Sequence, residues 1–255
     1  MGNKWIVSET GGDARSRLFC LPHAGGSAAV FQSWRKTLDP QIELCSLQYP
    51  GRGTRLDEDA ITELDTLIGE LATAIAPLTD RPYALFGHSL GALLAFEVTR
   101  ALGRGDARMP SALFLSACRA PMLLPSPFIV EAAALPEDAF ITALRTLGGV
   151  PEDLIEEPAF REVLLASTRS DFDLVSRYRY RATAPLDVPA TLLYGQTDKH
   201  ITGETLRDWR VEFTEAPAVR RFPGGHFYLE ADPVRNDILA LVTDALTPDS
   251  IVARI

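Results

Sequence analysis

The sequence predicts an α/β fold in which helices flank a mostly parallel central sheet, with a helical lid inserted into it. Short apolar runs alternate with longer segments of helical periodicity along most of the 255 residues. Strands that alternate with helices are typical of a parallel sheet covered on both faces. Residues 125–183 break this alternation, because they show helical patterns and no convincing strand. That stretch is therefore predicted to be the insertion.

The elements of this fold can be placed in chain order. The predicted strands are the apolar runs at residues 18–21, 42–47, 83–86, 113–115, 191–194 and 219–222. The predicted helices between the first four strands cover residues 30–38, 64–75 and 90–102, and helical stretches follow the last two strands. Parallel sheets of this kind bind ligands at the carboxyl ends of their strands. We therefore expect the functional residues in the loops that follow the strands.

The insertion is predicted to form a lid over that edge of the sheet. The chain then divides into a core of residues 1–124 and 184–255 and a lid of residues 125–183. Pro-Glu-Asp at 136–138 and again at 151–153 is typical of a helix start, because proline fits the first helical turn and acids favour its positive end. Phe140, Leu144 and Leu147 share one helical face, and we expect them to bind the substrate. The alternative is a structural subdomain with no lid role.

Composition and charge exclude several classes of function. Twenty-five Lys plus Arg stand against 34 Asp plus Glu, a formal net charge of −9, so no basic footprint for nucleic acid dominates. No apolar run approaches the roughly 18 residues of a membrane span, and no signal peptide is visible at the N-terminus. Cys20, Cys45 and Cys118 lie in apolar surroundings, which suits buried thiols in a reducing compartment. We therefore expect a cytoplasmic protein, and a monomer, without a membrane partner.

The strongest chemical signal is the motif Gly87-His88-Ser89-Leu90-Gly91. It lies between a predicted strand and a predicted helix, which is the context of a nucleophile elbow of the type G-x-S-x-G. Small residues two positions before and after Ser89 permit the strained turn, and the helix N-terminus favours developing negative charge. The string alone arises by chance, and its alternative interpretation is a structural glycine turn. Its context predicts Ser89 as the nucleophile.

A serine hydroxyl needs a general base. The candidates are the four histidines, His23, His88, His200 and His226. His226 is predicted to be the base, because it follows the last predicted strand and is the last histidine in the chain, matching the order serine, acid, histidine. His200 is the main rival for this role. The alternative interpretation of His200 is a surface histidine beside Lys199.

A third residue must orient the imidazole and stabilise its cationic form. Asp198 is predicted for this role, because it follows the predicted strand 191–194 and so lies at the carboxyl edge of the sheet. Asp187 precedes the same strand and is expected at the opposite edge. The alternative for Asp198 is a loop or helix-capping aspartate.

Two backbone N–H groups are expected to form an oxyanion hole. One belongs to Leu90, directly after the nucleophile, and the other comes from the loop after the first predicted strand. In the loop at residues 22–26 we assign this role to Ala24, since Gly25 and Gly26 let the backbone turn inward. The alternative for this loop is a plain strand-to-helix turn.

Several longer motifs together are more specific than the elbow. They are Cys20-Leu21-Pro22-His23-Ala24-Gly25-Gly26-Ser27, Gln48-Tyr49-Pro50-Gly51-Arg52, the elbow, Ser116-Ala117-Cys118-Arg119-Ala120-Pro121 and Gly224-Gly225-His226-Phe227. Because of these motifs, the chain resembles the stand-alone type II thioesterases of the α/β-hydrolase superfamily, which accompany polyketide synthases and nonribosomal peptide synthetases. The resemblance extends from about residue 17 to residue 243. The lid resembles the family in Asp171-Phe172, whereas Arg52-Gly53 replaces the commoner Arg-Glu.

The resemblance implies a serine thioesterase that hydrolyses acyl groups from the phosphopantetheine arm of acyl or peptidyl carrier proteins, clearing stalled or aberrant units. It implies no metal and no dissociable cofactor. The carrier protein would be a transient partner, with Arg177, Arg179 and Arg181 as candidates for docking. The alternatives are a small-molecule carboxylesterase or lipase, an acyltransferase, and a non-catalytic module that binds carrier proteins.

Overall fold

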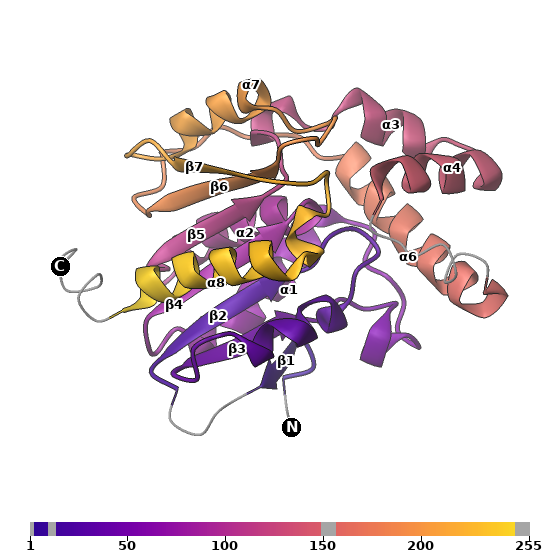
Figure 1. Ribbon diagram of the computed structural model, residues 1–255. Coiled ribbons are helices and arrows are strands. Elements are labelled where there is room, and N and C mark those ends of the chain that lie inside the picture. Colours follow the sequence, from indigo (N-terminus) through magenta and orange to yellow (C-terminus); the bar gives the residue numbers. More distant parts are fainter. Residues whose placement is uncertain (1–2, 10–13, 149–156, 248–255) are drawn as a thin grey trace.

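A single seven-stranded sheet organises the chain in the computed structural model, which describes residues 3–9, 14–148 and 157–247. The strand order is β1-β3-β2-β4-β5-β6-β7 (Figure 1). The strands are β1 (Ile6–Glu9), β2 (Ser16–Leu21), β3 (Ile42–Leu47), β4 (Tyr83–His88), β5 (Ala112–Ser116), β6 (Ala190–Gly195) and β7 (Ala218–Phe222). β1 pairs with β3 in the antiparallel direction, and all other neighbours are parallel. The predicted mostly parallel sheet is confirmed.

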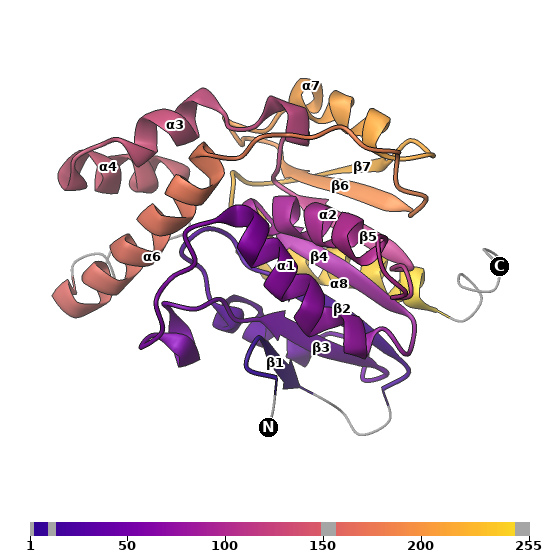
Figure 2. The same cartoon turned by 180° about the vertical axis from the view of Figure 1, so that it is seen from behind.

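Helices cover both faces of this sheet. α1 (Leu64–Ile75) and α2 (Leu90–Leu102) lie on one face, and α8 (Asp232–Leu246) lies on the other (Figures 1 and 2). Every residue of β2, β4 and β5 is consequently buried, which explains why these strands are apolar runs without alternation. The apolar face of α1 is buried as its periodicity predicts, and Cys20, Cys45 and Cys118 are buried thiols outside any disulfide.

The predicted elements differ from the structure mainly at short segments. Each predicted strand lies within an observed one, and α2 begins and ends as predicted. Residues 28–36 form a 3-10 helix, η1 (Ala28–Lys36), where an α-helix over 30–38 was expected. The helix after β6 is short, with α7 (Gly203–Leu206) followed by the 3-10 helix η5 (Arg207–Glu212). β1 was not predicted, because four residues with two polar side chains give almost no periodic signal.

Three helices stand together between β5 and β6, at one side of the sheet (Figures 1 and 2). They are α3 (Pro127–Ala133), α4 (Glu137–Leu147) and α6 (Pro158–Ser176). α4 begins at the first Pro-Glu-Asp, with Pro136 at the N-cap and two acids in the first turn; the second Pro-Glu-Asp, at 151–153, lies outside the described residues. These helices share a small apolar cluster made of Ala132, Phe140, Ile141, Leu144, Leu165 and Phe172.

In the described part of the chain, none of the helices combines the length and the hydropathy that crossing a bilayer requires.

Candidate active site

Ser89 occupies a sharp turn between β4 and α2. Its φ is +55°, and it shares a positive φ with only one other non-glycine residue among those described, Ala117. The crossing of strand and helix is tight, because a Cβ on Gly87 would lie 2.0 Å from the carbonyl oxygen of Gly91. A Cβ on Gly91 would likewise lie 2.0 Å from the carbonyl oxygen of Leu21. The glycines of the motif are therefore required by the backbone, and they hold Ser89 at the N-terminus of α2.

His226 and Asp198 meet across the ends of β6 and β7. His226 Nδ1 lies 2.7 Å from Asp198 Oδ2, and the carboxylate side chain is fully buried. Asp198 Oδ1 also accepts the backbone N–H groups of His200 at 2.8 Å and Ile201 at 3.2 Å. Burial works to raise the pKa of Asp198, but the hydrogen bond and charge of His226, with these two N–H groups, bring that pKa below its ordinary value. The carboxylate is therefore ionised and fixed toward the imidazole.

The other three histidines have different surroundings. His88 is buried, its Nδ1 lies 2.8 Å from Ser116 Oγ, and burial lowers its pKa well below the ordinary value. His23 donates from Nδ1 to its neighbour's carbonyl, and burial lowers its pKa to about 4. The ring of His200 packs against Phe128 on α3, with 4.3 Å between ring centroids. Only His226, of the four histidines, contacts a carboxylate through its ring in the described residues.

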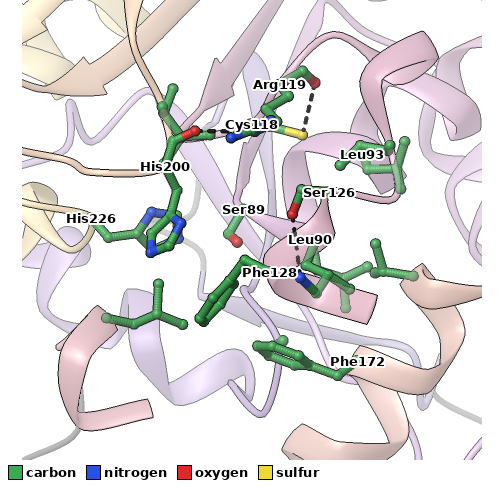
Figure 3. Close-up of a pocket in the computed structure, with 17 residues that line it drawn as sticks. Ser89, Leu90, Leu93, Cys118, Arg119, Ser126, Phe128, Phe172, His200 and His226 are labelled. Atoms are coloured by element: carbon green, nitrogen blue, oxygen red, sulfur yellow. Dashed lines mark hydrogen bonds between the residues drawn. The ribbon is translucent and has the colours of Figure 1, made fainter. Parts of the chain in front are cut away.

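Ser89 and His226 line the same pocket, whose space of about 630 Å³ includes its opening to solvent. Figure 3 shows both side chains at this pocket, with Phe128 and Phe172 beside them. A second pocket of about 460 Å³ also touches Ser89, His226 and Phe172. Most of the lining is apolar, so the space next to the serine suits a hydrocarbon group rather than a charged one.

The residues expected to bind substrate divide between pocket and core. Leu147 lines both pockets and Leu144 lines the second one. Phe140 lines neither: it is fully buried between the helices, with its ring centroid 5.4 Å from that of Phe172 and the Arg169 guanidinium 4.3 Å from its ring. Phe140 therefore lies behind the pocket wall rather than on it, because helical periodicity shows which residues share a face and not what that face meets.

Several wall residues were missed by the sequence reasoning. Phe128, Leu93 and Cys118 line the first pocket, and Phe172 lines both. Cys118 and Phe172 belong to motifs on which the family resemblance rests, so those motifs could have indicated that these two residues line the site. Leu93 gave none, because it reads as one more apolar position of α2.

The two residues expected to supply the oxyanion hole lie close to Ser89. Leu90 is the first residue of α2 and lines the first pocket, and Ala24 lines both. The N–H groups in the first turn of a helix have no partner within that helix. Both residues therefore border the space in front of the serine.

Comparison with known proteins gives a consistent result. A family model described as "Thioesterase domain" matches residues 16–244. The gramicidin S biosynthesis protein GrsT of Aneurinibacillus migulanus is 36% identical over 228 residues, 89% of this chain and 88% of that protein. The RedJ thioesterase from the prodiginine pathway of Streptomyces coelicolor is 35% identical, with a TM-score of 0.84 over 91% of this chain and 86% of that one.

A second solved structure extends the match. The type II thioesterase BorB, from the borrelidin biosynthetic cluster, is 32% identical and has a TM-score of 0.86 over 95% of this chain and 98% of that one. A family match over most of the chain, a mostly parallel sheet flanked by helices, and these neighbours agree. The chain belongs to the thioesterase domain family and has the α/β-hydrolase fold.

Proposed function

We propose that this thioesterase hydrolyses acyl groups from the phosphopantetheine arm of carrier proteins, using Ser89, His226 and Asp198 as a catalytic triad. The observation that carries the proposal is the joint placement of Ser89, at a positive φ, and of an Asp198-bound His226 on one apolar pocket. Ser89 is the nucleophile, His226 the general base and Asp198 the residue that orients the imidazole. The Leu90 and Ala24 N–H groups stabilise the oxyanion.

The chemistry follows from this arrangement. Because His226 Nδ1 is held by Asp198, Nε2 is the nitrogen that takes the proton from the Ser89 hydroxyl. The serine oxygen attacks the thioester carbonyl, and the negative charge moves to the carbonyl oxygen, where the two N–H groups stabilise it. The carbon–sulfur bond breaks and the thiol leaves with the proton from His226. Water, deprotonated by His226, then cleaves the acyl-serine to release a carboxylic acid and regenerate Ser89.

The shape of the site supports a substrate of two parts. The apolar pocket beside Ser89 suits an acyl chain, whereas a folded carrier protein must stay outside and extend its arm to Ser89. We assign residues 125–183 to a lid, since Phe128 of α3, Leu147 of α4 and Phe172 of α6 all reach the pocket. Residues 1–124 and 184–255 form the core that holds the catalytic residues.

The relatives support the biological setting. GrsT is a gramicidin S biosynthesis protein, and BorB is a type II thioesterase of the borrelidin cluster. By this likeness, the chain would remove stalled or wrongly loaded acyl units from the carriers of a polyketide or nonribosomal peptide assembly line. Neither a metal nor a dissociable cofactor takes part in the scheme.

Intact-mass spectrometry of carrier proteins tests the proposal. Carriers loaded with a series of acyl groups should lose the acyl mass and keep the phosphopantetheine mass when treated with the enzyme. The Ser89→Ala variant should leave the acyl mass in place. Faster turnover of nitrophenyl esters than of every acyl-carrier would instead assign the chain to oxygen esters, and transfer of the acyl group to an added alcohol or amine would make it an acyltransferase.

A further inference from the structure

We propose that Asp171 and Arg52 are positioning residues for this hydrolysis, because their buried ion pair holds the turn that carries the Ala24 N–H group. Asp171 lies on α6 and Arg52 follows β3, so both are distant from Ser89 in the sequence. Neither residue lines the two pockets at Ser89. The inference rests on the proposed function, in which the Ala24 N–H stabilises the oxyanion.

The turn itself is defined by its backbone. The carbonyl of His23 accepts the N–H of Gly26 at 3.0 Å, which closes a four-residue turn. Gly25 has φ +75°, and Ala24 is not among the described non-glycine residues with positive φ, so the turn is of type II. In the trans peptide between His23 and Ala24, the N–H points away from the carbonyl that closes the turn. The direction of the Ala24 N–H therefore depends on this turn being kept.

The central peptide of the turn, between Ala24 and Gly25, is held at both ends. Its carbonyl accepts a hydrogen bond from His23 Nδ1 at 2.9 Å. Its N–H, on Gly25, donates to Asp171 Oδ2 at 2.8 Å. Type I and type II turns differ by a flip of this peptide. Such a flip leaves φ at Ala24 unchanged, so the Asp171 carboxylate acts by anchoring the whole turn, with its Ala24 N–H, to α6.

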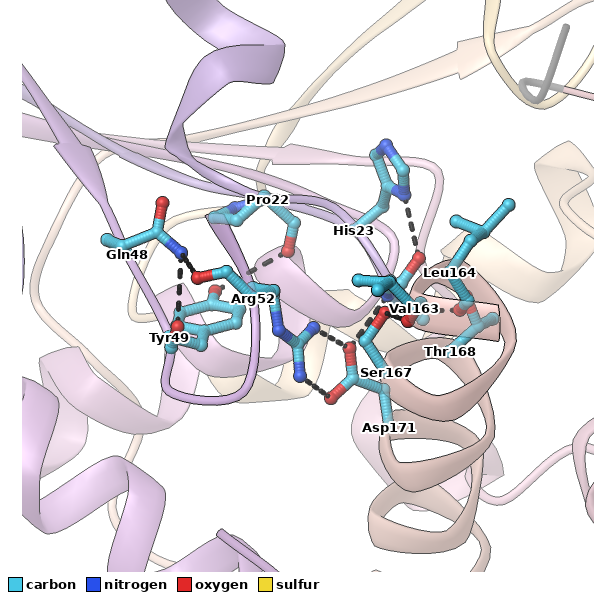
Figure 4. A network of polar contacts seen from close by, with 12 residues as sticks. Pro22, His23, Gln48, Tyr49, Arg52, Val163, Leu164, Ser167, Thr168 and Asp171 are labelled. Atoms are coloured by element: carbon cyan, nitrogen blue, oxygen red, sulfur yellow. Dashed lines mark hydrogen bonds and ion pairs between the residues drawn. The ribbon is translucent and has the colours of Figure 1, made fainter. Parts of the chain in front are cut away.

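Arg52 holds that carboxylate in place (Figure 4). Its two terminal nitrogens bind the two carboxylate oxygens, Nη1 to Oδ2 and Nη2 to Oδ1, the latter at 2.9 Å. The side chains are 5% and 1% exposed. The bidentate pair fixes both carboxylate oxygens, and a charged acceptor forms a stronger bond to a backbone N–H than a neutral one.

α6 also packs closely against the turn. A Cβ on Gly25 would lie 2.1 Å from Thr168 Oγ1, which is one helical turn before Asp171. The glycine therefore serves two needs, since it adopts the positive φ and leaves room for α6. The carboxylate reaches the Gly25 N–H only because the helix comes this close.

The double variant Arg52→Met/Asp171→Leu tests the proposal. Removing both charges avoids leaving one of them buried and unpaired, so the fold is expected to persist. The Gly25 N–H then has no acceptor. We expect kcat on a small acyl-N-acetylcysteamine thioester to fall by about 10- to 100-fold, since loss of a whole oxyanion donor costs about 10²–10³. KM should stay within about 2-fold, because neither residue lines the pockets.

A transition-state analogue separates positioning from a structural role. An alkyl trifluoromethyl ketone adds to Ser89 as an oxyanion, so its affinity should fall by the same factor as kcat. The affinity for an unreactive amide of the same chain length should not change. The control is Arg17→Met/Glu43→Leu, which removes another ion pair of a buried arginine and a glutamate. Arg17 lies near the start of β2, at the end of the strands opposite to Ser89. The control variant should keep the wild-type kcat.

The outcomes distinguish this inference from the function on which it rests. Failure of the wild type to hydrolyse any thioester contradicts the proposed function. The positioning role is overturned by a different result. In that case Ser89→Ala abolishes hydrolysis, but the double variant folds and keeps the wild-type kcat and the wild-type affinity for the ketone. If the double variant does not fold, Asp171→Asn should still lower kcat, and the Gly25 amide of the wild type should exchange with solvent at least about 100-fold more slowly than an exposed amide. Fast exchange overturns the proposal.

Discussion

Ser89 combines a reactive position with an unfavourable backbone. A φ of +55° is rare for a residue with a Cβ, and such conformations cost on the order of 1–3 kcal/mol. The tight crossing of β4 and α2 at Gly87 and Gly91 enforces it. The strain is located at the residue that we propose as nucleophile, so removing the hydroxyl and relieving the strain can be examined separately.

Two substitutions at Ser89 should have the same effect on activity and different effects on stability. Ser89→Ala and Ser89→Gly should both abolish thioester hydrolysis, because neither has a nucleophile. Ser89→Gly should also raise the free energy of unfolding by about 1 kcal/mol relative to Ser89→Ala, because glycine tolerates the positive φ. Urea titration and turnover of an acyl-carrier measure the two effects. Residual activity near that of the wild type would exclude Ser89 as the nucleophile.

Asp198 should matter through the tautomer of His226. In Asp198→Asn, the amide can donate to Nδ1 and so favour the imidazole tautomer that cannot accept the serine proton, and kcat should fall by about 10⁴. Asp187→Asn is the matched control, because Asp187 accepts a hydrogen bond from Thr214 at an exposed site. It should leave kcat unchanged. A larger loss in Asp187→Asn than in Asp198→Asn would show that the acid is misplaced.

At the scale of elements, the sequence predicts what local periodicity and motif context determine. The buried strands and α2 are found because their apolar residues are contiguous or regularly spaced. β1 escapes prediction, since its four residues are held by pairing with β3 rather than by any pattern of their own. The bond between Asp171 and Gly25 escapes as well, because it joins residues 146 positions apart. Contacts of that kind arise from packing and leave no local signal.

α4 shows the same limit within one helix. Phe140 and Leu147 share a helical face, yet Phe140 packs against Phe172 while Leu147 reaches both pockets. Along its length, the helix passes from the apolar cluster that it shares with α3 and α6 to the wall of the pocket. Its two ends should consequently respond differently to substitution.

Leu147→Trp should narrow the space for acyl chains. The larger ring should lower kcat/KM for long-chain acyl-N-acetylcysteamine thioesters by about 10-fold or more and spare the acetyl substrate, since pocket contacts of this size discriminate by about 1–3 kcal/mol. Phe140→Leu is the control: it should destabilise the apolar cluster of α3, α4 and α6 by about 1 kcal/mol or more without changing the preference for chain length. An equal loss across all chain lengths in Leu147→Trp would contradict a role for this wall in selectivity.

At the scale of the whole molecule, the partly buried His23 and the buried His88 link stability to pH. Burial lowers the pKa of His23 to about 4 and that of His88 well below its ordinary value, whereas both titrate near 6.5 in an unfolded chain. Below pH 6.5 the unfolded state therefore binds more protons than the folded state. Stability should fall as the pH is lowered from 6.5 toward 4.

Urea unfolding at several pH values measures this loss. His23 alone should lower the free energy of unfolding by about 1–2 kcal/mol between pH 7 and pH 5. The variant His23→Leu, which cannot titrate, should show a flatter profile over the same range. A wild-type stability that is constant or rises on acidification would mean that these histidines accept protons in the folded state.

The net charge of the chain bears on how it would meet the proposed carrier protein. With a formal charge of −9, the enzyme should not attract an acidic carrier over long distances. Of the three arginines considered for docking, Arg177 faces Glu63 at 3.8 Å and Arg181 faces Asp65 at 3.4 Å. In each exposed pair the carboxylate offsets the positive charge of the arginine, so the pair exerts little attraction at a distance. The guanidinium groups remain accessible for direct contact.

Salt dependence therefore distinguishes steering from contact. Raising the salt from about 20 mM to about 200 mM shortens the screening length to below 10 Å, and kcat/KM for an acidic acyl-carrier should stay level or rise by up to about 2-fold. Reversing the charge of Arg177, Arg179 and Arg181 together should raise KM for the acyl-carrier at both salt concentrations and leave small thioesters unaffected. A steep fall of kcat/KM with salt would reveal a basic steering surface elsewhere. Only the carrier is large enough to reach these arginines while its arm occupies the pocket. If the charge-reversed variant lost activity equally on acyl-carriers and on small thioesters, the substitutions would have damaged the end of α6 rather than removed a docking contact.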